Sequence, residues 1–436
     1  MHSKATRFSI YEHQFTTLDG SILRRFLIVL VLADETTVFT NFHKYCRSPF
    51  KSVRRAASTD EARVKFIVPF LNYAFFYEGI GSLDKLTADV VNRYLNAYGM
   101  CELPWDDEFT HRKKSTVERV ARYILDFLIL YIEDRKDQCK LKKSHLYRTV
   151  DDRDKHGKSY KRKELIFDIR CKDNNRMILR DMPNAAFDIM FYYVMEHRPE
   201  LLGLVMLGAF AGLRPSEACN VRREDSPLGP GILFTKVNGR VEDIAIDLSA
   251  EKKLRSDNVN VGNIKKERIQ HVSPLFIDLF VDAYNIYLDY LKDKQYEEEY
   301  GPLSINRSGK AMTNASYYTA FTKMFKEELA PIYLKSDDPD VVIFGKLLTE
   351  HNIGPHILRH WFTVQLVLAG VSNPADLMKW RGDTSPESAI WYLNNKGELS
   401  RKFKKLNNES FEYQYWKAEK QHERRRKNDN EHRPED

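Results

Sequence analysis

The chain has 436 residues, 42% of them hydrophobic and 12% aromatic, which excludes a disordered protein and predicts two or three domains with their own cores. A net charge of +7 favours nucleic acid or another polyanion as partner. The five cysteines are scattered and form no CxxC pair or Cys/His cluster, so we expect reduced thiols in a cytoplasmic protein and no zinc site. The apolar run at 26–33 is far shorter than the roughly 20 residues that span a bilayer, so we expect no membrane contact.

The N-terminal third of the chain changes from a β pattern to a helical one. Residues 1–58 mix alternating apolar residues with an Asp19-Gly20 turn, which predicts a β-containing extension. This extension is either structural or a DNA-contacting arm. Residues 59–138 predict a helical domain, because apolar residues between Val117 and Leu128 recur at helical spacing.

A basic cluster stands just before the last helix of that domain. It contains Arg112, Lys113 and Lys114. The cluster is either a solvated loop or a set of phosphate contacts at a helix N-terminus, and both interpretations stay open at this point.

The remaining two thirds divide by composition. Residues 139–176 are dense in mixed charge and poor in apolar residues, which predicts a basic interdomain linker. Residues 177–416 alternate helical patterns with a β segment around an Asn238-Gly239 turn and predict the largest domain. Residues 417–436 are charged throughout and predict a disordered tail. The sequence therefore predicts a mainly α protein with a small antiparallel β-sheet, an α+β fold.

The stretch between Gly354 and Tyr392 brings together residue types that suit a phosphate. A helix can begin after Gly354-Pro355, and His356 and Arg359 then point from one face of its first turn. A helix N-terminus offers free N–H groups and a positive dipole end. Tyr392 follows after a second helix-start signal, so we expect these three side chains on short, neighbouring elements.

A second arginine stands earlier, in the segment GLRPSE. The helix that begins at Leu201 is expected to end near Gly212, and Pro215 can start the next one. Arg214 thus falls at a turn, where its guanidinium can reach outward. An isolated arginine at a turn is usually solvated, so its interpretation depends on what lies near it.

Taken together, these segments resemble the tyrosine recombinase family, also called phage integrases, over about residues 60–400. The resemblance is carried, in chain order, by GLRPSE with Arg214 and Glu217, a lysine near a β-turn, HILRH with His356 and Arg359, Gly382, and Tyr392 nine residues after Asp383. It implies a helical core-binding domain followed by a catalytic domain, double-stranded DNA as partner, and neither a cofactor nor a metal. It further implies a homo-oligomer on DNA, a dimer or tetramer, with possible accessory proteins. The expected location is the cytoplasm, and the bacterial nucleoid when the protein is bound to DNA.

The resemblance also implies a role for each residue. Tyr392 would attack a phosphodiester and form a covalent 3′-phosphotyrosine, while Arg214 and Arg359 would hold the phosphate in bidentate fashion. His356 would orient the phosphate and assist proton transfer, and Glu217 would support the site. A lysine would protonate the leaving 5′-oxygen. Alignment of the strand expected at 269–275 on Val272 places Lys265 there, whereas alignment on Arg268 places nothing basic there and leaves Lys266 as the nearest candidate. We favour Lys265, with Lys236 and Lys253 as outside candidates.

Asp383 is where this chain departs from the family pattern, which has histidine or tryptophan at that position. An ionised carboxylate there repels phosphate. Asp383 could be turned away and paired with Arg381, or could have a raised pKa and donate a proton. Alternatively the site is weakened, since the loss of one such donor costs on the order of 10²-fold in rate.

Three functions are compatible with these features to different degrees. The first is a site-specific recombinase or integrase that integrates or excises a mobile element. The second is a DNA-binding accessory protein of recombinase fold that no longer cleaves, which Asp383 favours. The third, a metal-dependent nuclease or transposase, is disfavoured because no acidic residues group near the histidine and arginines in a ligand pattern.

Overall fold

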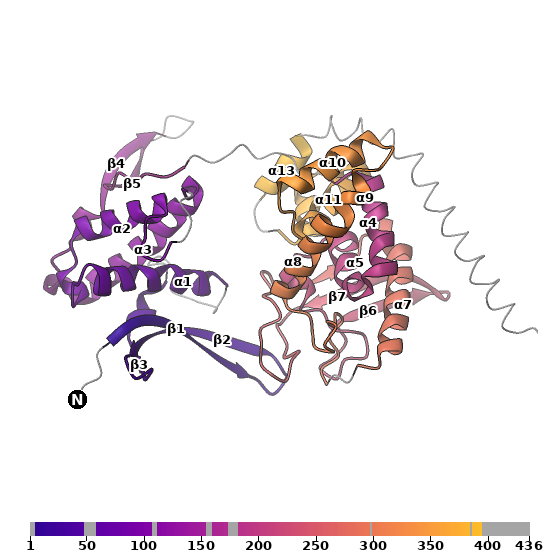
Figure 1. Cartoon of the computed structure of the whole chain (residues 1–436), viewed down its shortest axis with the longest axis horizontal. Helices are drawn as coiled ribbons and strands as arrows, with labels where there is room; N and C mark the ends of the chain where they lie inside the picture. The colour runs from indigo at the N-terminus through magenta and orange to yellow at the C-terminus, as the bar shows by residue number, and fades with distance from the viewer. Residues whose placement is uncertain are drawn as a thin grey trace, which may run out of the picture. The chain divides into compact units, whose positions relative to one another are not determined.

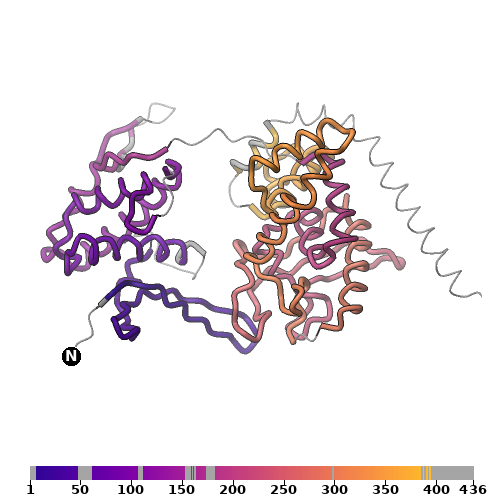
Figure 2. The backbone as a smooth tube through the Cα atoms, viewed as in Figure 1, coloured from indigo at the N-terminus to yellow at the C-terminus, as the bar shows by residue number. Residues whose placement is uncertain are grey.

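The computed structural model describes residues 5–47, 58–106, 111–153, 159–172, 182–296, 299–383 and 386–394. The chain forms two compact units. The first comprises Met1–Thr17 and Leu23–Ile178, and the second comprises Leu18–Ile22 and Leu179–Asp436 (Figure 2). The predicted finer division into five segments stays a prediction.

The first unit begins with a small sheet, as the alternating N-terminal pattern predicts. The strands β1 (Ala5–Thr16), β2 (Ile22–Leu32) and β3 (Thr37–Phe39) lie in the order β1-β2-β3. The apolar run at 26–33 contributes most of β2, with Ile28, Val29 and Val31 buried. The run is thus a half-buried strand rather than a core helix.

Helices form the rest of the core of the first unit, which confirms the helical prediction. They are α1 (Ser58–Asn72), which continues into a π-helical turn at Tyr73–Tyr77, α2 (Ala88–Met100) and α3 (Lys114–Arg135), with short 3₁₀ turns at Phe42–Tyr45, Leu83–Lys85, Lys136–Gln138 and Lys143–His145. The apolar face of α3 is buried along its length, and Phe8 and Ile28 of the sheet belong to the same hydrophobic core.

The stretch predicted as a linker contains a β-hairpin, which the charge-based prediction missed. The strands β4 (Tyr147–Arg153) and β5 (Ser159–Leu165) pair antiparallel (Figure 1). Oppositely charged residues face each other across the pair, with Asp151 opposite Lys161 and Arg148 opposite Glu164. Such oppositely charged pairs can stabilise a β-hairpin whose strands do not alternate apolar and polar residues. A prediction based on hydrophobicity therefore indicates only a charged loop here.

The second unit surrounds one fully buried helix. All nine residues of α5 (Leu202–Phe210) are buried, and α5 packs against α7 and α11. The other helices are α4 (Asn184–His197), α6 (Pro215–Ala218), α7 (Ile277–Lys294), α8 (Asn314–Lys323), α9 (Ala330–Tyr333), α10 (Pro339–Glu350), α11 (His356–Leu368), α12 (Pro374–Arg381) and α13 (Glu387–Asn394), with 3₁₀ turns at Pro199–Leu201 and Pro274–Phe276 and a π-helical turn at Met324–Leu329. Figure 1 shows how these helices gather around the centre of the unit.

A three-stranded antiparallel sheet completes the second unit. Its strands are β6 (Ile232–Val237), β7 (Arg240–Leu248) and β8 (Arg268–His271), in the order β6-β7-β8. The turn between β6 and β7 is at Asn238 and Gly239, both with positive φ, as predicted. The strand predicted at 269–275 ends earlier, because Pro274 opens a 3₁₀ turn.

The fold confirms the α+β class. None of the described helices is long and apolar enough to cross a membrane. The residues after Asn394, including the charged tail predicted at 417–436, lie outside the described residues.

Candidate active site

The first turn of α11 supplies the most buried cation of the site. Arg359 is 1% exposed, and its Nη1 donates to the backbone oxygens of Gly212, at 2.5 Å, and Arg381, at 2.6 Å. Two carbonyls from distant parts of the chain therefore fix the guanidinium plane. The remaining nitrogen, Nη2, is directed toward Asp383.

The turn after α5 delivers Arg214 to the same place. Gly212 has a φ of +64°, and a Cβ there would lie 2.4 Å from the ring of Phe362, so only glycine fits. The backbone then turns, and Arg214 becomes the residue that caps α6. Its Nη1 donates to Glu217 at 3.0 Å, and its Nη2 donates to Asp383 at 2.5 Å.

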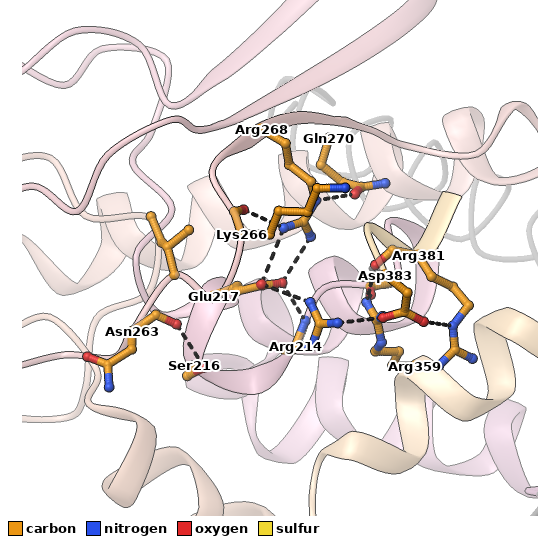
Figure 3. A network of polar contacts seen from close by, with 12 residues as sticks. Arg214, Ser216, Glu217, Asn263, Lys266, Arg268, Gln270, Arg359, Arg381 and Asp383 are labelled. Carbon is orange, nitrogen blue, oxygen red and sulfur yellow. Dashed lines mark hydrogen bonds and ion pairs between the residues drawn. The ribbon is translucent and has the colours of Figure 1, made fainter. Parts of the chain in front are cut away.

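Asp383 holds three guanidinium groups together (Figure 3). One oxygen, Oδ1, accepts from both Arg214 and Arg359 at 2.5 Å, and Oδ2 accepts from Nε of Arg381 at 2.6 Å. The Asp383 side chain is only 10% exposed. A single oxyanion therefore occupies the point on which three arginines converge, and those arginines come from GLRPSE, HILRH and WRGD.

The ionisation of Asp383 decides between the alternatives left open by the sequence. Burial alone would raise its pKa, but the charges of Arg359, Arg381 and Arg214 outweigh burial and hold the pKa below its usual value. The idea that Asp383 is a proton donor with a raised pKa is therefore wrong. The pairing with Arg381 is confirmed, and the carboxylate also binds the two predicted phosphate ligands.

The crowding of positive charge also acts on the neighbours. Burial, together with Arg214 and Arg381, lowers the pKa of Arg359 to about 9, which leaves it charged at neutral pH. His356 is exposed to solvent, but partial desolvation of its ring and the nearby Arg359 and Arg381 lower its pKa to about 4. His356 is therefore a neutral imidazole at pH 7.

Glu217 and Arg268 form a second layer behind the arginines. Glu217 is fully buried and accepts from Arg214 and from Arg268, whose Nη2 lies 2.9 Å from its Oε2. Burial would raise the pKa of Glu217, but its bonds and ion pair with Arg268, and the charge of Arg214, lower it below the usual value. Arg268 also donates to Gln270 at 2.8 Å within β8, and its pair with Glu217 connects the start of β8 to the site.

Tyr392 lies on α13 and is 3% exposed. Its hydroxyl is in hydrogen-bonding contact with Nδ1 of His360, the last residue of HILRH, to which the sequence assigned no role. The guanidinium of Arg381 lies 5.1 Å from the centre of the Tyr392 ring. Arg381 thus connects the tyrosine to the carboxylate of Asp383.

The lysine candidates occupy different surroundings. Lys265 and Lys266 are exposed in the loop that precedes β8, and the backbone oxygen of Lys266 accepts from Arg268 (Figure 3). Lys236 is exposed on β6, and Lys253 has its ammonium 5.5 Å from the centre of the Tyr300 ring. The position of Lys265 and Lys266 beside Arg268 keeps both as candidates, and the choice between them stays a prediction.

The basic cluster of the first unit is only partly available to a ligand. Arg112 is half-buried, pairs with Asp106 at 2.7 Å and lies 4.1 Å over the ring of Tyr98. Lys113 and Lys114 are exposed at the N-terminus of α3. The fold therefore uses Arg112 internally, while the two lysines stay open to a phosphate.

Sequence reasoning did not assign a role to three residues that the structure brings into the site. They are Arg268, Arg381 and His360. Arg381 was named only as a partner for Asp383, and in HILRH only the first histidine was assigned. A signal for His360 did exist, because residues four apart on a helix share a face.

Among the described residues, no three or more His, Cys, Asp or Glu side chains gather as a metal ion would require. No protein-family model matches the sequence, and no curated protein matches it.

Solved structures whose fold is similar to that of this chain include two recombinases and an integrase. One is the XerH site-specific recombinase bound to difH substrate in a pre-cleavage complex, at 18% identity over 76% of each chain, with a TM-score of 0.42. Another is the Tn1549 transposon integrase in complex with transposon right end DNA, at 16% identity over 80% of this chain and 92% of that one, with a TM-score of 0.46. A third is the XerA recombinase, at 13% identity over 81% of this chain and 93% of that one, with a TM-score of 0.32.

Proposed function

We propose that this protein cuts and rejoins DNA strands through a covalent 3′-phosphotyrosine on Tyr392, as a site-specific recombinase or integrase of a mobile element. The observation that supports the proposal is the convergence of Arg214 and Arg359 on one carboxylate oxygen at 2.5 Å each. Two guanidiniums aimed at one oxyanion form a site that a non-bridging phosphate oxygen can occupy. The nucleophile candidate, Tyr392, is joined to this site through Arg381.

The proposed reaction uses the residues as follows. Arg214 and Arg359 neutralise the charge that develops on the phosphate, and His356, neutral at pH 7, donates a hydrogen bond to it. Tyr392 attacks phosphorus, and Lys265 or Lys266 protonates the 5′-oxygen that leaves. The phosphodiester energy is kept in the tyrosyl link, so rejoining needs no cofactor. A dimer or tetramer on double-stranded DNA would carry out the paired strand exchange, with accessory proteins as possible further partners.

Asp383 and the burial of Tyr392 specifically favour a second candidate function, a DNA-binding protein of recombinase fold that does not cleave. In the structure, the Asp383 carboxylate already occupies the anion position between the arginines, and the Tyr392 hydroxyl already contacts His360. Cleavage requires a phosphate to displace the Asp383 carboxylate and Tyr392 to be uncovered. The two candidates therefore differ in whether DNA can drive this exchange.

Capture of the covalent intermediate distinguishes the two functions and locates the DNA site in the same experiment. Purified protein is mixed with sheared and nicked genomic DNA from its source cells, denatured in detergent, and the DNA that stays attached to protein is sequenced. We expect recurrent attachment sites with the wild type, none with Tyr392→Phe, and unchanged recovery with Tyr318→Phe, an exposed tyrosine of the same unit. Tight DNA binding by a wild type that never yields attached DNA would favour the accessory protein.

A further inference from the structure

We infer that His360 is the base that takes the hydroxyl proton of Tyr392 during strand cleavage; the inference rests on the proposed function. The observation is the contact between Nδ1 of His360 and the Tyr392 hydroxyl oxygen. HILRH contains two histidines four residues apart. The first, His356, lies near enough to Arg359, Arg381 and Arg214 for their charges to lower its pKa, while the second touches the atom that would attack phosphorus.

The helices hold this contact from both sides. His360 and His356 lie on one face of α11, with ring centres 4.9 Å apart and ring planes nearly perpendicular. Tyr392 comes from α13, which packs against α11, and its ring centre lies 5.9 Å from that of His360. Tyr392 is almost fully buried and His360 is half-buried, so bulk water has little access to the hydroxyl. A base is needed at that place, because water cannot readily take the proton there.

The charges around the pair favour transfer of the proton. The guanidinium of Arg381 lies 5.1 Å from the centre of the tyrosine ring, where it stabilises the negative charge that develops on the phenolic oxygen. The adjacent imidazole of His356 is neutral at pH 7 because its pKa is lowered to about 4, so it adds no charge that would oppose protonation of His360. Asp383 binds Arg381 through Oδ2, whereas Arg214 and Arg359 bind Oδ1, so the bond that keeps the Arg381 guanidinium in place can persist when a phosphate displaces Oδ1.

The proton and bond changes balance without any further reactant. The imidazole of His360 carries its proton on Nε2 and accepts the Tyr392 hydroxyl proton at Nδ1. The bond between the tyrosine oxygen and phosphorus forms as the bond between phosphorus and the 5′-oxygen breaks. The leaving oxygen takes a proton from the lysine. In rejoining, the 5′-hydroxyl returns its proton to the lysine as it attacks phosphorus, the bond between phosphorus and the tyrosine oxygen breaks, and the imidazolium returns its proton to the tyrosine.

The kinetic test uses the covalent adduct on a DNA fragment recovered by the genomic capture. His360→Ala and His360→Gln are both expected to slow adduct formation by about 10²- to 10⁴-fold, the usual contribution of a positioned base, with DNA binding retained. Gln preserves a hydrogen-bond acceptor but cannot take the proton. Free imidazole is expected to restore part of the rate of the Ala variant. His351→Ala, which removes an exposed histidine after α10, serves as the control and keeps the wild-type rate. A Gln variant with the wild-type rate would overturn the base role.

A second measurement separates this inference from the proposed function, because it needs no DNA. Tyr392 is replaced by 3-fluorotyrosine in the full chain, and its ¹⁹F resonance is followed as the pH is raised. His360→Ala is expected to shift both the resonance and its titration midpoint, while His351→Ala shifts neither. No response to His360→Ala overturns the contact itself. A clear response from a protein that never forms an adduct would refute the proposed reaction and reduce the pair to a structural hydrogen bond.

Discussion

Replacement of Asp383 by asparagine tests whether its carboxylate occupies a phosphate site. The change removes the negative charge that three guanidiniums share at 2.5–2.6 Å while it preserves the size of the side chain. Removing one partner of a buried ion pair costs about 3–5 kcal/mol, and we expect about 3 kcal/mol here, because the amide oxygen can still accept a hydrogen bond. Stability is lost because the positive charges of Arg214, Arg359 and Arg381 are left together without a neutralising carboxylate.

The informative measurement is how this loss responds to phosphate. If the arginines form an anion site, inorganic phosphate takes the place of the missing carboxylate and restores about 2.7 kcal/mol when its concentration is 100 times its Kd. Urea unfolding is followed by tryptophan fluorescence in sodium phosphate and in sodium chloride of equal ionic strength. Trp361 is a suitable reporter, because it is buried on α11 and stacks on Phe187 with ring centres 3.8 Å apart.

A matched variant separates an anion site from general ion-pair loss. Asp247→Asn breaks another buried pair of the second unit, in which Asp247 lies 2.7 Å from Arg222, and only one guanidinium is left behind. We expect this variant to be destabilised without a specific response to phosphate. The reasoning is refuted if Asp383→Asn gains no more from phosphate than Asp247→Asn and the wild type do.

Three further predictions concern strand chemistry, backbone geometry and pH. On a mapped DNA site, the leaving 5′-oxygen is replaced by sulfur, which leaves without needing a proton. If Lys265 is the general acid, the Lys265→Ala variant recovers adduct formation on this substrate. Recovery by Lys266→Ala instead would assign the general-acid role to Lys266. Gly382→Ala is expected to lower the free energy of unfolding by about 1–3 kcal/mol because of the backbone strain at its φ of +61°. The loss is larger still because the new Cβ would lie 2.3 Å from Nε of Arg268. Gly370→Ala, at φ +103° with no atom within 4 Å of the new Cβ, carries only the backbone cost. As the pH falls from about 6.5 toward 4, His356 takes up a proton in the unfolded chain but not in the native state, so the free energy of unfolding decreases over that window. In His356→Gln this part of the pH dependence, measured by urea titration, is expected to disappear.

The sequence predicted the parts of the site that depend on local signals. Gly212 and Pro215 end one helix and start the next, and this places Arg214 at a turn, as the structure shows. Pro355 precedes α11 in the same way and sets His356 and Arg359 on its first turn. Such positions follow from backbone preferences of single residues, so they do not depend on the tertiary fold.

What the sequence could not supply are contacts between distant segments. The ion pair between Arg214 and Asp383 joins residues 169 positions apart, and Arg268 reaches Glu217 across 51. The family motifs imply that Arg214, Arg359 and position 383 share one site, but no periodicity or motif shows how a carboxylate pairs there, so the fate of Asp383 stayed open between three alternatives. The choice of His360 over His356 as the partner of Tyr392 is of the same kind, because the two histidines share a helix face and only the position of α13 separates them.

The shared carboxylate oxygen also affects how salt would act on DNA binding. Lysines and arginines that neutralise DNA phosphates release cations bound to the DNA, and each released ion steepens the fall of affinity with salt. In this protein the counterion of Arg214 and Arg359 is a side chain of the same chain. A displaced Asp383 carboxylate stays within the protein, so under the proposed function the two arginines would bring less net positive charge to a phosphate and add less to the salt dependence of binding. This innermost contact would then depend less on salt than contacts made by exposed lysines.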